Sequence, residues 1–328
     1  MGSRINFGII GGSSFAQRSM IPAIQGLKNH FNLIGIASRS GQKAEELSEK
    51  FNVPGFASYE TLLETEGLQA VYIPLPNSLH FEWIEKCLLK GLHVLVEKSL
   101  ACSPQEVESL ITIAGERGLA LMENFQFRFH SQLAYIKSLV ADGTIGELRC
   151  LRSSFGFPPF KDKDNIRYNA SLGGGALLDA GAYPIRITQE FLGTDLLVEA
   201  SNMSFDDELK VDIWGGGYLK QRSGSLFSEI AFGFDNYYQC NIELWGSKGK
   251  VSTNRIFTAP IDFKPTIVLE TSDGTKSIIW ESDNAYQNML QYFYTLVAEE
   301  EKRERENLSN KVQANLIQQL REKATLTT

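Results

Sequence analysis

Residues 173–186 combine side chains that could handle a proton. If this stretch is helical, Asp179 and Tyr183 lie four residues apart and share one face. Gly181 leaves room on that face for a bulky partner, and Pro184 predicts a kink just after the tyrosine. An acid beside a phenol fits acid–base chemistry. The same pattern also fits an ordinary helix that carries a buried, hydrogen-bonded tyrosine.

The first 123 residues alternate short apolar runs with helical segments. Buried strands are predicted at 5–10, 33–37, 70–73, 93–96 and 119–122, with helices at 20–24, 43–50, 81–90 and from Pro104. This alternation is typical of a doubly wound parallel sheet, a Rossmann domain. Ligands of such sheets bind at the carboxyl ends of the strands, so the residues that follow each strand are the candidate binding residues.

A glycine turn follows the first strand. Gly11, Ser13 and Ala16 occupy the three key places of the pattern G-x-G-x-x-G/A, and Ser13 replaces the second glycine. A strand, tight turn and helix direct backbone N–H groups at a pyrophosphate, although a plain strand–turn–helix gives the same pattern. The predicted dinucleotide-binding residues of this turn are Gly11, Gly12, Ser13, Ser14, Phe15 and Ala16.

The residues after the second strand indicate which nicotinamide cofactor is bound. An NAD site would carry an acid here for the ribose hydroxyls, but the sequence has Ser38-Arg39-Ser40. A guanidinium flanked by hydroxyls suits a 2′-phosphate. A solvated surface arginine is the alternative. The missing acid predicts NADP(H) in preference to NAD(H).

Beyond residue 123 the pattern becomes that of an α+β domain. A helix at 131–140 precedes strands at 148–155, 196–203, 211–214, 226–234, 238–245, 267–270 and 278–280, with a hairpin turn at 272–274 and closing helices at 284–298 and 312–323. The predicted fold class is α/β: an N-terminal Rossmann domain (1–123) and a C-terminal α+β domain (124–328) with a large, mostly antiparallel open sheet.

Three further features of this half have structural interpretations. Glycines 215–217 are interpreted as a strand interruption or bend, and the charge run 299–306 as a solvated helix face. The strands outnumber the helices that could cover both faces of their sheet. We therefore expect a homodimer or homotetramer that forms through this domain.

Composition excludes several function classes. The 328 residues carry a net charge of −7, which argues against nucleic acid or an anionic membrane as the main partner. The four cysteines are far apart, so we expect reduced thiols, no metal site and a cytoplasmic location. The segment before Ile5 has no secretory h-region, and no run approaches the roughly 18 apolar residues of a membrane span.

Four motifs in order carry a family resemblance: the turn at 11–16, Ile-Pro-Leu-Pro-Asn-Ser-Leu-His at 73–80, Val-Glu-Lys at 96–98, and residues 173–183. Together they resemble the Gfo/Idh/MocA oxidoreductases over essentially the whole chain. In that family the lysine of Glu-Lys-Pro reaches the nicotinamide and the reacting oxygen. This implies that role for Lys98, although Ser99 replaces the proline. The resemblance further implies cofactor binding by Leu75, Pro76, Asn77, His80, Glu97, Lys98 and Arg167.

The inositol dehydrogenase branch of this family carries Asp-x-Gly-x-His-x-x-Asp on its catalytic helix. Here Tyr183 replaces the histidine and Arg186 the last acid. A tyrosine at this place is similar to glucose-fructose oxidoreductase, dimeric dihydrodiol dehydrogenase and the deoxysugar 3-ketoreductases. The resemblance implies that Tyr183 is the acid–base and that Lys98 polarises the oxygen, since a nearby cation favours the phenolate. Asp179 would orient Lys98 or hold a substrate hydroxyl.

These observations predict an NADP(H)-dependent oxidoreductase acting on CH–OH groups. It would transfer hydride to or from a sugar carbonyl or carbinol, with a nucleotide-linked keto-sugar as the favoured substrate. An aldose or dihydrodiol dehydrogenase and a non-catalytic NADP-binding regulator stay open as alternatives. Intact Lys98 and Tyr183 favour an enzyme. Of the four histidines, His80 is expected to pack near the cofactor, and His30 and His130 to be peripheral.

Overall fold

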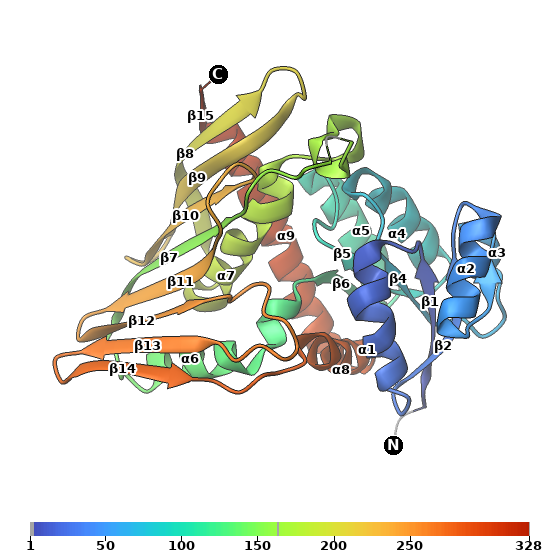
Figure 1. Ribbon diagram of the computed structural model, residues 1–328, viewed down its shortest axis with the longest axis horizontal. Helices are drawn as coiled ribbons and strands as arrows, with labels where there is room; N and C mark the ends of the chain where they lie inside the picture. Colours follow the sequence, from blue (N-terminus) through green and yellow to red (C-terminus); the bar gives the residue numbers. More distant parts are fainter. Residues whose placement is uncertain (1–2, 163, 328) are drawn as a thin grey trace. The chain divides into compact units, whose positions relative to one another are not determined.

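The computed structural model describes residues 3–162 and 164–327 and divides into two compact units (Figure 1). Unit 1 comprises Met1–Asn124 and Tyr286–Lys311, and unit 2 comprises Phe125–Ala285 and Val312–Thr328. Among the described residues, none of the helices has the length and apolar character needed to cross a bilayer.

Unit 1 is built on a parallel sheet of six strands in the order β3-β2-β1-β4-β5-β6. This order is that of a doubly wound dinucleotide-binding sheet and confirms the predicted Rossmann fold. The order reverses between β1 and β4, so the loops after these two strands flank the expected ligand crevice. The strands are β1 (Ile5–Ile10), β2 (Phe31–Ala37), β3 (Gly55–Phe56), β4 (Ala70–Ile73), β5 (His93–Glu97) and β6 (Leu121–Asn124).

Helices cover the apolar strands of unit 1. The core of this sheet includes Phe7, whose ring meets that of Phe293 in α8 edge-on at 5.9 Å. A capping box is present at the start of α5, where Ser103 and Glu106 satisfy each other's backbone N–H groups. The helices are η1 (Ala16–Met20), α1 (Ile21–Gly26), α2 (Gly41–Phe51), α3 (Tyr59–Leu63), η2 (Asn77–Leu79), α4 (His80–Leu89), α5 (Pro104–Glu116), α8 (Ala285–Ala298) and the first half of α9 (Glu300–Lys323).

Unit 2 is built on a nine-stranded sheet in the order β14-β13-β12-β11-β7-β10-β9-β8-β15. Only β7–β10 and β8–β15 pair in parallel among its described strands, which confirms the predicted mostly antiparallel sheet. The strands are β7 (Leu148–Gly156), β8 (Leu196–Asp206), β9 (Val211–Gln221), β10 (Phe227–Gly233), β11 (Gln239–Gly246), β12 (Gly249–Asn254), β13 (Thr266–Thr271), β14 (Gly274–Ile279) and β15 (Ala324–Thr327).

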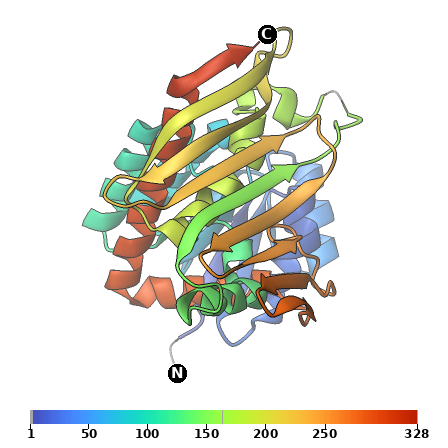
Figure 2. The same cartoon turned by 90° about the vertical axis from the view of Figure 1, so that its left-hand side faces the viewer.

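Helices pack on one face of the nine-stranded sheet. Figure 2 shows the yellow-green α7 (Ala182–Leu192) and the red C-terminal half of α9 behind the strands, while the opposite face is turned to the viewer. The remaining helices of the unit are η3 (Gln126–Phe129), α6 (Ser131–Ala141), η4 (Ile166–Tyr168), η5 (Ala170–Leu172) and η6 (Leu177–Gly181). The core between α7 and the sheet is apolar, which explains the alternating burial along β7, β10 and β11.

The interpretation of glycines 215–217 as an interruption is wrong, because β9 runs through them unbroken. A Cβ on Gly215 would lie 2.7 Å from the Asn202 carbonyl oxygen, and one on Gly216 would lie 2.5 Å from the Ile230 carbonyl oxygen. The glycines therefore allow neighbouring strands to approach closely rather than ending the strand.

The charge run 299–306 lies, from Glu300 on, in the first turns of α9, which begins at Glu300 and not at the predicted residue 312. Glu304 and Arg305 are exposed as expected for a solvated face, but Glu306 is only 1% exposed. The prediction is therefore wrong for Glu306. The sequence did not indicate a helix before residue 312, because that part of α9 is mostly polar and shows no clear helical spacing of apolar residues.

Candidate functional site

The glycine turn of unit 1 is shaped by close packing. Gly11 has a φ of +109°, and a Cβ there would lie 2.8 Å from Leu75 Cδ2 in the loop after β4. A Cβ on Gly12 would lie 2.4 Å from Leu47 Cδ1 of α2. Both glycines therefore allow the turn to lie close against its neighbours, because a side chain at either position would meet them. The turn fits a pyrophosphate, because a helix begins at Ser14, directly after it.

Ser13 replaces the second glycine of the pattern without disturbing this turn. Its Oγ accepts a hydrogen bond from the Ala16 backbone N–H at 3.1 Å. The helix after the turn then widens into η1, a π-helical segment, before continuing as α1. Phe15, in the first helical turn, packs edge-on against Tyr286 of α8 at 5.9 Å.

Arg39 is exposed at the carboxyl end of β2, between two serines that shape the loop. Ser40 caps α2 by accepting from the Lys43 N–H at 3.4 Å, and its own N–H donates to Ser38 Oγ at 3.4 Å. The serines therefore hold backbone groups. Sequence reasoning missed Tyr59, which is hydrogen-bonded to the Arg39 side chain. Burial raises the pKa of Tyr59, so its hydroxyl stays protonated beside the guanidinium.

His80 links the loops that follow β4 and β5. Its ring is fully buried, with Nδ1 2.7 Å from the Ser99 carbonyl oxygen and Nε2 2.8 Å from the Leu75 carbonyl oxygen. Asn77 adds a second link, since its Oδ1 accepts from the Ser99 N–H at 3.2 Å. Burial, helped by the charge of Lys98, lowers the pKa of His80 to about 4. The ring is therefore neutral at pH 7 and holds the loops that carry Pro76 and Lys98.

The Glu97 carboxyl group accepts hydrogen bonds from side chains of the two neighbouring strands, β4 and β6. Tyr72 Oη and Asn124 Nδ2 each donate to Glu97 Oε1 at 2.6 Å. Glu97 pairs directly with Asn124 across β5 and β6, and Tyr72 pairs with Leu95, two residues before Glu97 on the same face. Burial raises the pKa of Glu97 against these hydrogen bonds. Glu97 thus anchors the strand end that presents Lys98.

In unit 2, Asp179 and Tyr183 do not lie on one regular α-helix. The helix begins at Ala176 and passes through the π-helical η6, so its turns are wider here than those of the α-helix that the sequence predicts. This π-helical segment ends at Gly181, before Tyr183 and Pro184, and the kink just after Tyr183 stays a prediction. Pro184 cannot donate to the carbonyl four residues earlier, and the wider turn before it accommodates that loss.

The two side chains have different surroundings within unit 2. Asp179 Oδ2 accepts from Arg167 Nε at 2.6 Å, and this pair is partly buried. The Tyr183 ring packs against four phenylalanines at centroid distances of 5.0–5.9 Å, namely Phe125, Phe127, Phe155 and Phe257. The space expected beside Gly181 is filled by Phe232, 3.0 Å from where a Cβ would lie. Tyr183 is therefore held in a rigid aromatic surrounding.

A partly buried ion cluster forms around Glu190 of α7 in the same unit. Glu190 binds Arg128 Nε at 2.8 Å and Lys137 Nζ at 2.5 Å. Burial alone would raise the pKa of Glu190, but the charges of Arg128, Lys137 and Arg186 outweigh it and lower the pKa to about 2.

The expectation that His130 is peripheral is wrong: it is 2% exposed and caps α6 by accepting from the Gln132 N–H.

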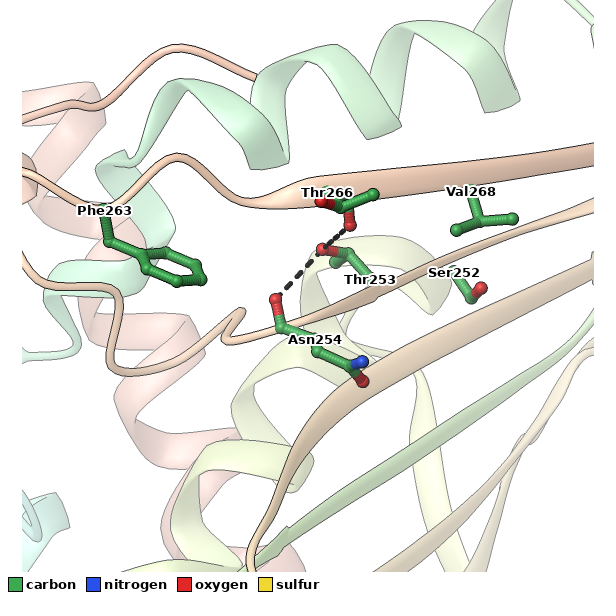
Figure 3. A pocket seen from close by; sticks show the side chains of 6 residues that line it. All are labelled: Ser252, Thr253, Asn254, Phe263, Thr266 and Val268. Atoms are coloured by element: carbon green, nitrogen blue, oxygen red, sulfur yellow. Dashed lines mark hydrogen bonds between the residues drawn. The ribbon is translucent and has the colours of Figure 1, made fainter. Parts of the chain in front are cut away.

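A cavity of about 260 Å³ lies between β12, β13 and the loop that carries Phe263 (Figure 3). Thr253 Oγ1 donates within it to the Thr266 and Asn254 carbonyl oxygens, at 2.9 and 3.1 Å. It contains none of the predicted site residues and no ionisable side chain. Within residues 3–162 and 164–327, no group of three or more His, Cys, Asp or Glu side chains could hold a metal ion.

Comparison with known families decides the classification. Residues 5–125 match the family described as "Oxidoreductase family, NAD-binding Rossmann fold", and residues 133–252 match the "GFO/IDH/MocA C-terminal domain". The chain belongs to the Gfo/Idh/MocA oxidoreductase family. The predicted family and the predicted oxidoreductase class are thereby confirmed.

Several characterised members of the family are similar over nearly the full chain. The dTDP-3,4-didehydro-2,6-dideoxy-alpha-D-glucose 3-reductase of Actinomadura kijaniata is 37% identical, over 88% of this chain and 86% of its own. The D-xylose 1-dehydrogenase (NADP(+)) 2 of Haloferax volcanii is 30% identical, over 88% and 87%. A crystal structure of a 3-ketoreductase from A. kijaniata with NADP and TDP-benzene superposes with a TM-score of 0.93 and 35% identity, covering 99% of both chains.

Variants of that 3-ketoreductase have also been crystallised with NADP and TDP-benzene. One carries phenylalanine in place of a tyrosine, and others carry alanine or glutamate in place of a lysine. The residue types are those of the pair Tyr183 and Lys98 here.

The neutral state of buried His80 predicts how stability depends on pH. Its pKa in the folded protein, about 4, lies below the ordinary value, so folding favours the neutral ring. The resulting stability is fully present above about pH 6.5 and is lost as pH falls toward 4, a change of about 3 kcal/mol. His80→Gln, which does not titrate there, should reduce the fall in unfolding free energy between pH 7 and pH 4 by this amount. Urea unfolding at a series of pH values measures it, and identical pH profiles for both proteins would refute the assignment.

Proposed function

We propose that this protein is an NADPH-dependent ketoreductase that reduces the keto group of a nucleotide-linked deoxysugar. The observation that carries the proposal is the match of the whole chain, at a TM-score of 0.93, to a 3-ketoreductase crystallised with NADP and TDP-benzene. Four proteins named dTDP-3,4-didehydro-2,6-dideoxy-alpha-D-glucose 3-reductase are 34–38% identical over most of this chain. Their shared name supports the same substrate class here.

Unit 1 supplies the groups that fit an NADP cofactor. The pyrophosphate would lie on the turn from Gly11 to Ala16, and the 2′-phosphate beside Arg39. Leu75, Pro76 and Asn77 border the crevice between β1 and β4, where the nicotinamide half would extend toward Lys98. The bound cofactor supplies the hydride for the carbonyl carbon.

The predicted catalytic residues Tyr183, Lys98 and Asp179 would handle the proton and the substrate. We propose that the Tyr183 hydroxyl donates its proton to the carbonyl oxygen as that oxygen gains negative charge, and that the Lys98 ammonium polarises the same oxygen. The phenylalanines around Tyr183 fix its ring and exclude water. Asp179 is paired with Arg167, so we propose that the pair orients a sugar hydroxyl or phosphate near the reacting carbon.

An aldose dehydrogenase is the second candidate, favoured by the 30% identity to a D-xylose 1-dehydrogenase. A turnover screen separates the two. Nucleotide-linked keto-sugars are tested for reduction with NADPH, and free aldoses for oxidation with NADP⁺. We expect activity at least tenfold higher on the nucleotide-linked ketones, because the nucleotide part adds binding energy that a free aldose lacks. Comparable or greater activity on free aldoses would favour the dehydrogenase.

Replacing Arg39 should change cofactor preference. Arg39→Asp removes the 2′-phosphate partner and adds repulsion, so NADPH affinity should fall about 10- to 100-fold while NADH affinity changes little. Arg117→Asp is the matched control, because Arg117 follows the end of α5, at the edge of the sheet opposite the strands' carboxyl ends. Fluorescence titration gives both affinities. Equal affinity of the unmodified protein for the two cofactors would exclude the assigned role of Arg39.

Removing the Tyr183 hydroxyl should slow turnover without changing cofactor binding. Tyr183→Phe keeps the aromatic packing, and the loss of general acid catalysis should lower kcat by about 10²- to 10⁴-fold. Lys98→Met should be at least as damaging. The double variant should be little worse than the worse single one if both groups act on one oxygen. Additive losses would mean independent roles, and unchanged turnover of Tyr183→Phe would reduce Tyr183 to packing.

We also propose that unit 2 forms a homo-oligomer through the sheet face turned to the viewer in Figure 2. Trp245 on β11 is 50% exposed and lies against Arg152 of β7, which binds Glu229 and Glu243. An exposed aromatic group among charges of both signs suits contact with a second copy about a two-fold axis. Sedimentation at micromolar concentration should show a dimer or tetramer, and Trp245→Glu should shift it toward monomer. A monomeric unmodified protein would refute this proposal.

A further inference from the structure

The helix that carries Asp179 and Tyr183 lacks a capping side chain of its own. Gly175 precedes its first residue, Ala176, and adopts a φ of +109° that favours glycine. The first backbone N–H groups of a helix have no partner within the helix and need one when they are buried. Ala176 and Leu177 are both fully buried, so water cannot satisfy them.

Asp212, at the start of β9, supplies the missing cap. Its Oδ2 accepts from the Leu177 N–H at 2.5 Å, and its carboxylate also accepts from the Ala176 N–H. A Cβ on Gly175 would lie 2.3 Å from Asp212 Oδ1, so the carboxylate occupies the space of the absent side chain. Asp212 is 7% exposed, and burying a carboxylate is costly unless its oxygens are well bonded.

The cap belongs to a closed set of bonds around Asp179. The Gly175 N–H donates to the Arg167 carbonyl oxygen at 2.9 Å, and the Asp179 N–H donates to the Gly175 carbonyl oxygen at 3.2 Å. The Arg167 side chain closes the set, since its Nε donates to the Asp179 carboxylate at 2.6 Å. Asp212 is the group in this set that comes from the sheet, so it links the helix start to a rigid element.

We propose that Asp212 is a positioning residue: its carboxylate, held by β9, fixes the start of the helix that places Asp179 and Tyr183 for catalysis. The inference rests on the proposed function of Tyr183. The π-helical turn η6 between the cap and Tyr183 is less regular than an α-helix and is common at functional sites. Because the capping carboxylate comes from β9, the sheet fixes the position of this turn. The helix propensity of the residues in the turn then matters less.

The test compares Asp212→Ala with Asp206→Ala. Asp206 lies in the same hairpin, and its carboxylate also accepts two backbone N–H groups, those of Glu208 and Leu209, at 2.9 Å. Both variants lose a carboxylate that binds the backbone. We expect kcat to fall about 10- to 100-fold in Asp212→Ala, because small displacements of catalytic groups carry such costs. Asp206→Ala should retain kcat within about twofold, and NADPH affinity should be unchanged in both.

Rescue by a conservative variant separates positioning from general destabilisation. Asp212→Asn keeps an acceptor oxygen and should recover kcat to within about fivefold of the unmodified protein, since asparagine caps helices about as well as aspartate. If Asp212→Ala does not fold, Gly175→Ala is the second variant: its Cβ would displace the Asp212 carboxylate, and its φ of +109° would strain the same helix start, so kcat should again fall at least tenfold.

Two results would overturn the inference. The first is unchanged kcat in folded Asp212→Ala, or in Gly175→Ala, while Tyr183→Phe abolishes turnover. The second is an equal loss of kcat in the Asp206→Ala control. Unchanged turnover in Tyr183→Phe itself would instead refute the proposed function, so the two failures are distinguishable.

Discussion

Hydrogen bonds made by side chains within each unit hold in place the loops, strand end and helix start that carry the proposed functional residues. In unit 1, His80 binds the loops after β4 and β5, and Glu97 ties the end of β5 to its neighbours. In unit 2, Asp212 caps the helix of Asp179 and Tyr183. A buried backbone group left without a partner costs about 1–3 kcal/mol, so the contacts of His80 and Asp212 strongly favour one conformation of the backbone that they bind.

The same constraint explains the ionisation states of these side chains. Burial holds His80 neutral, because an imidazolium would lose its hydration inside the protein. Burial also raises the pKa of Glu97 and of Asp212, while their hydrogen bonds oppose that rise. His80 and Asp212 are buried, whereas Arg39, the proposed partner of a ligand phosphate, is exposed.

Much of the fold could be predicted from the sequence because its parallel strands are short, mostly apolar runs between helices. The nine-stranded sheet was harder: β12 (Gly-Lys-Val-Ser-Thr-Asn) is largely polar, and β15 is a short strand at the end of α9. The role of the glycines in β9 could not be predicted from the neighbouring sequence. These positions must be glycine because carbonyl oxygens of strands β8 and β10 approach them closely. Among site residues, Tyr59, Tyr72 and Asp212 act through long-range contacts that leave no motif in the sequence.

The central claim is hydride transfer to the keto group of a nucleotide-linked sugar. The most direct measurement is a single turnover with NADPH deuterated at the transferred position of nicotinamide C4, followed by mass and NMR analysis of the sugar. The account predicts one deuterium on the carbon of the former carbonyl, with slower formation in Tyr183→Phe. A protein that binds NADPH but leaves every nucleotide-linked keto-sugar free of deuterium would contradict it and favour a non-catalytic regulator.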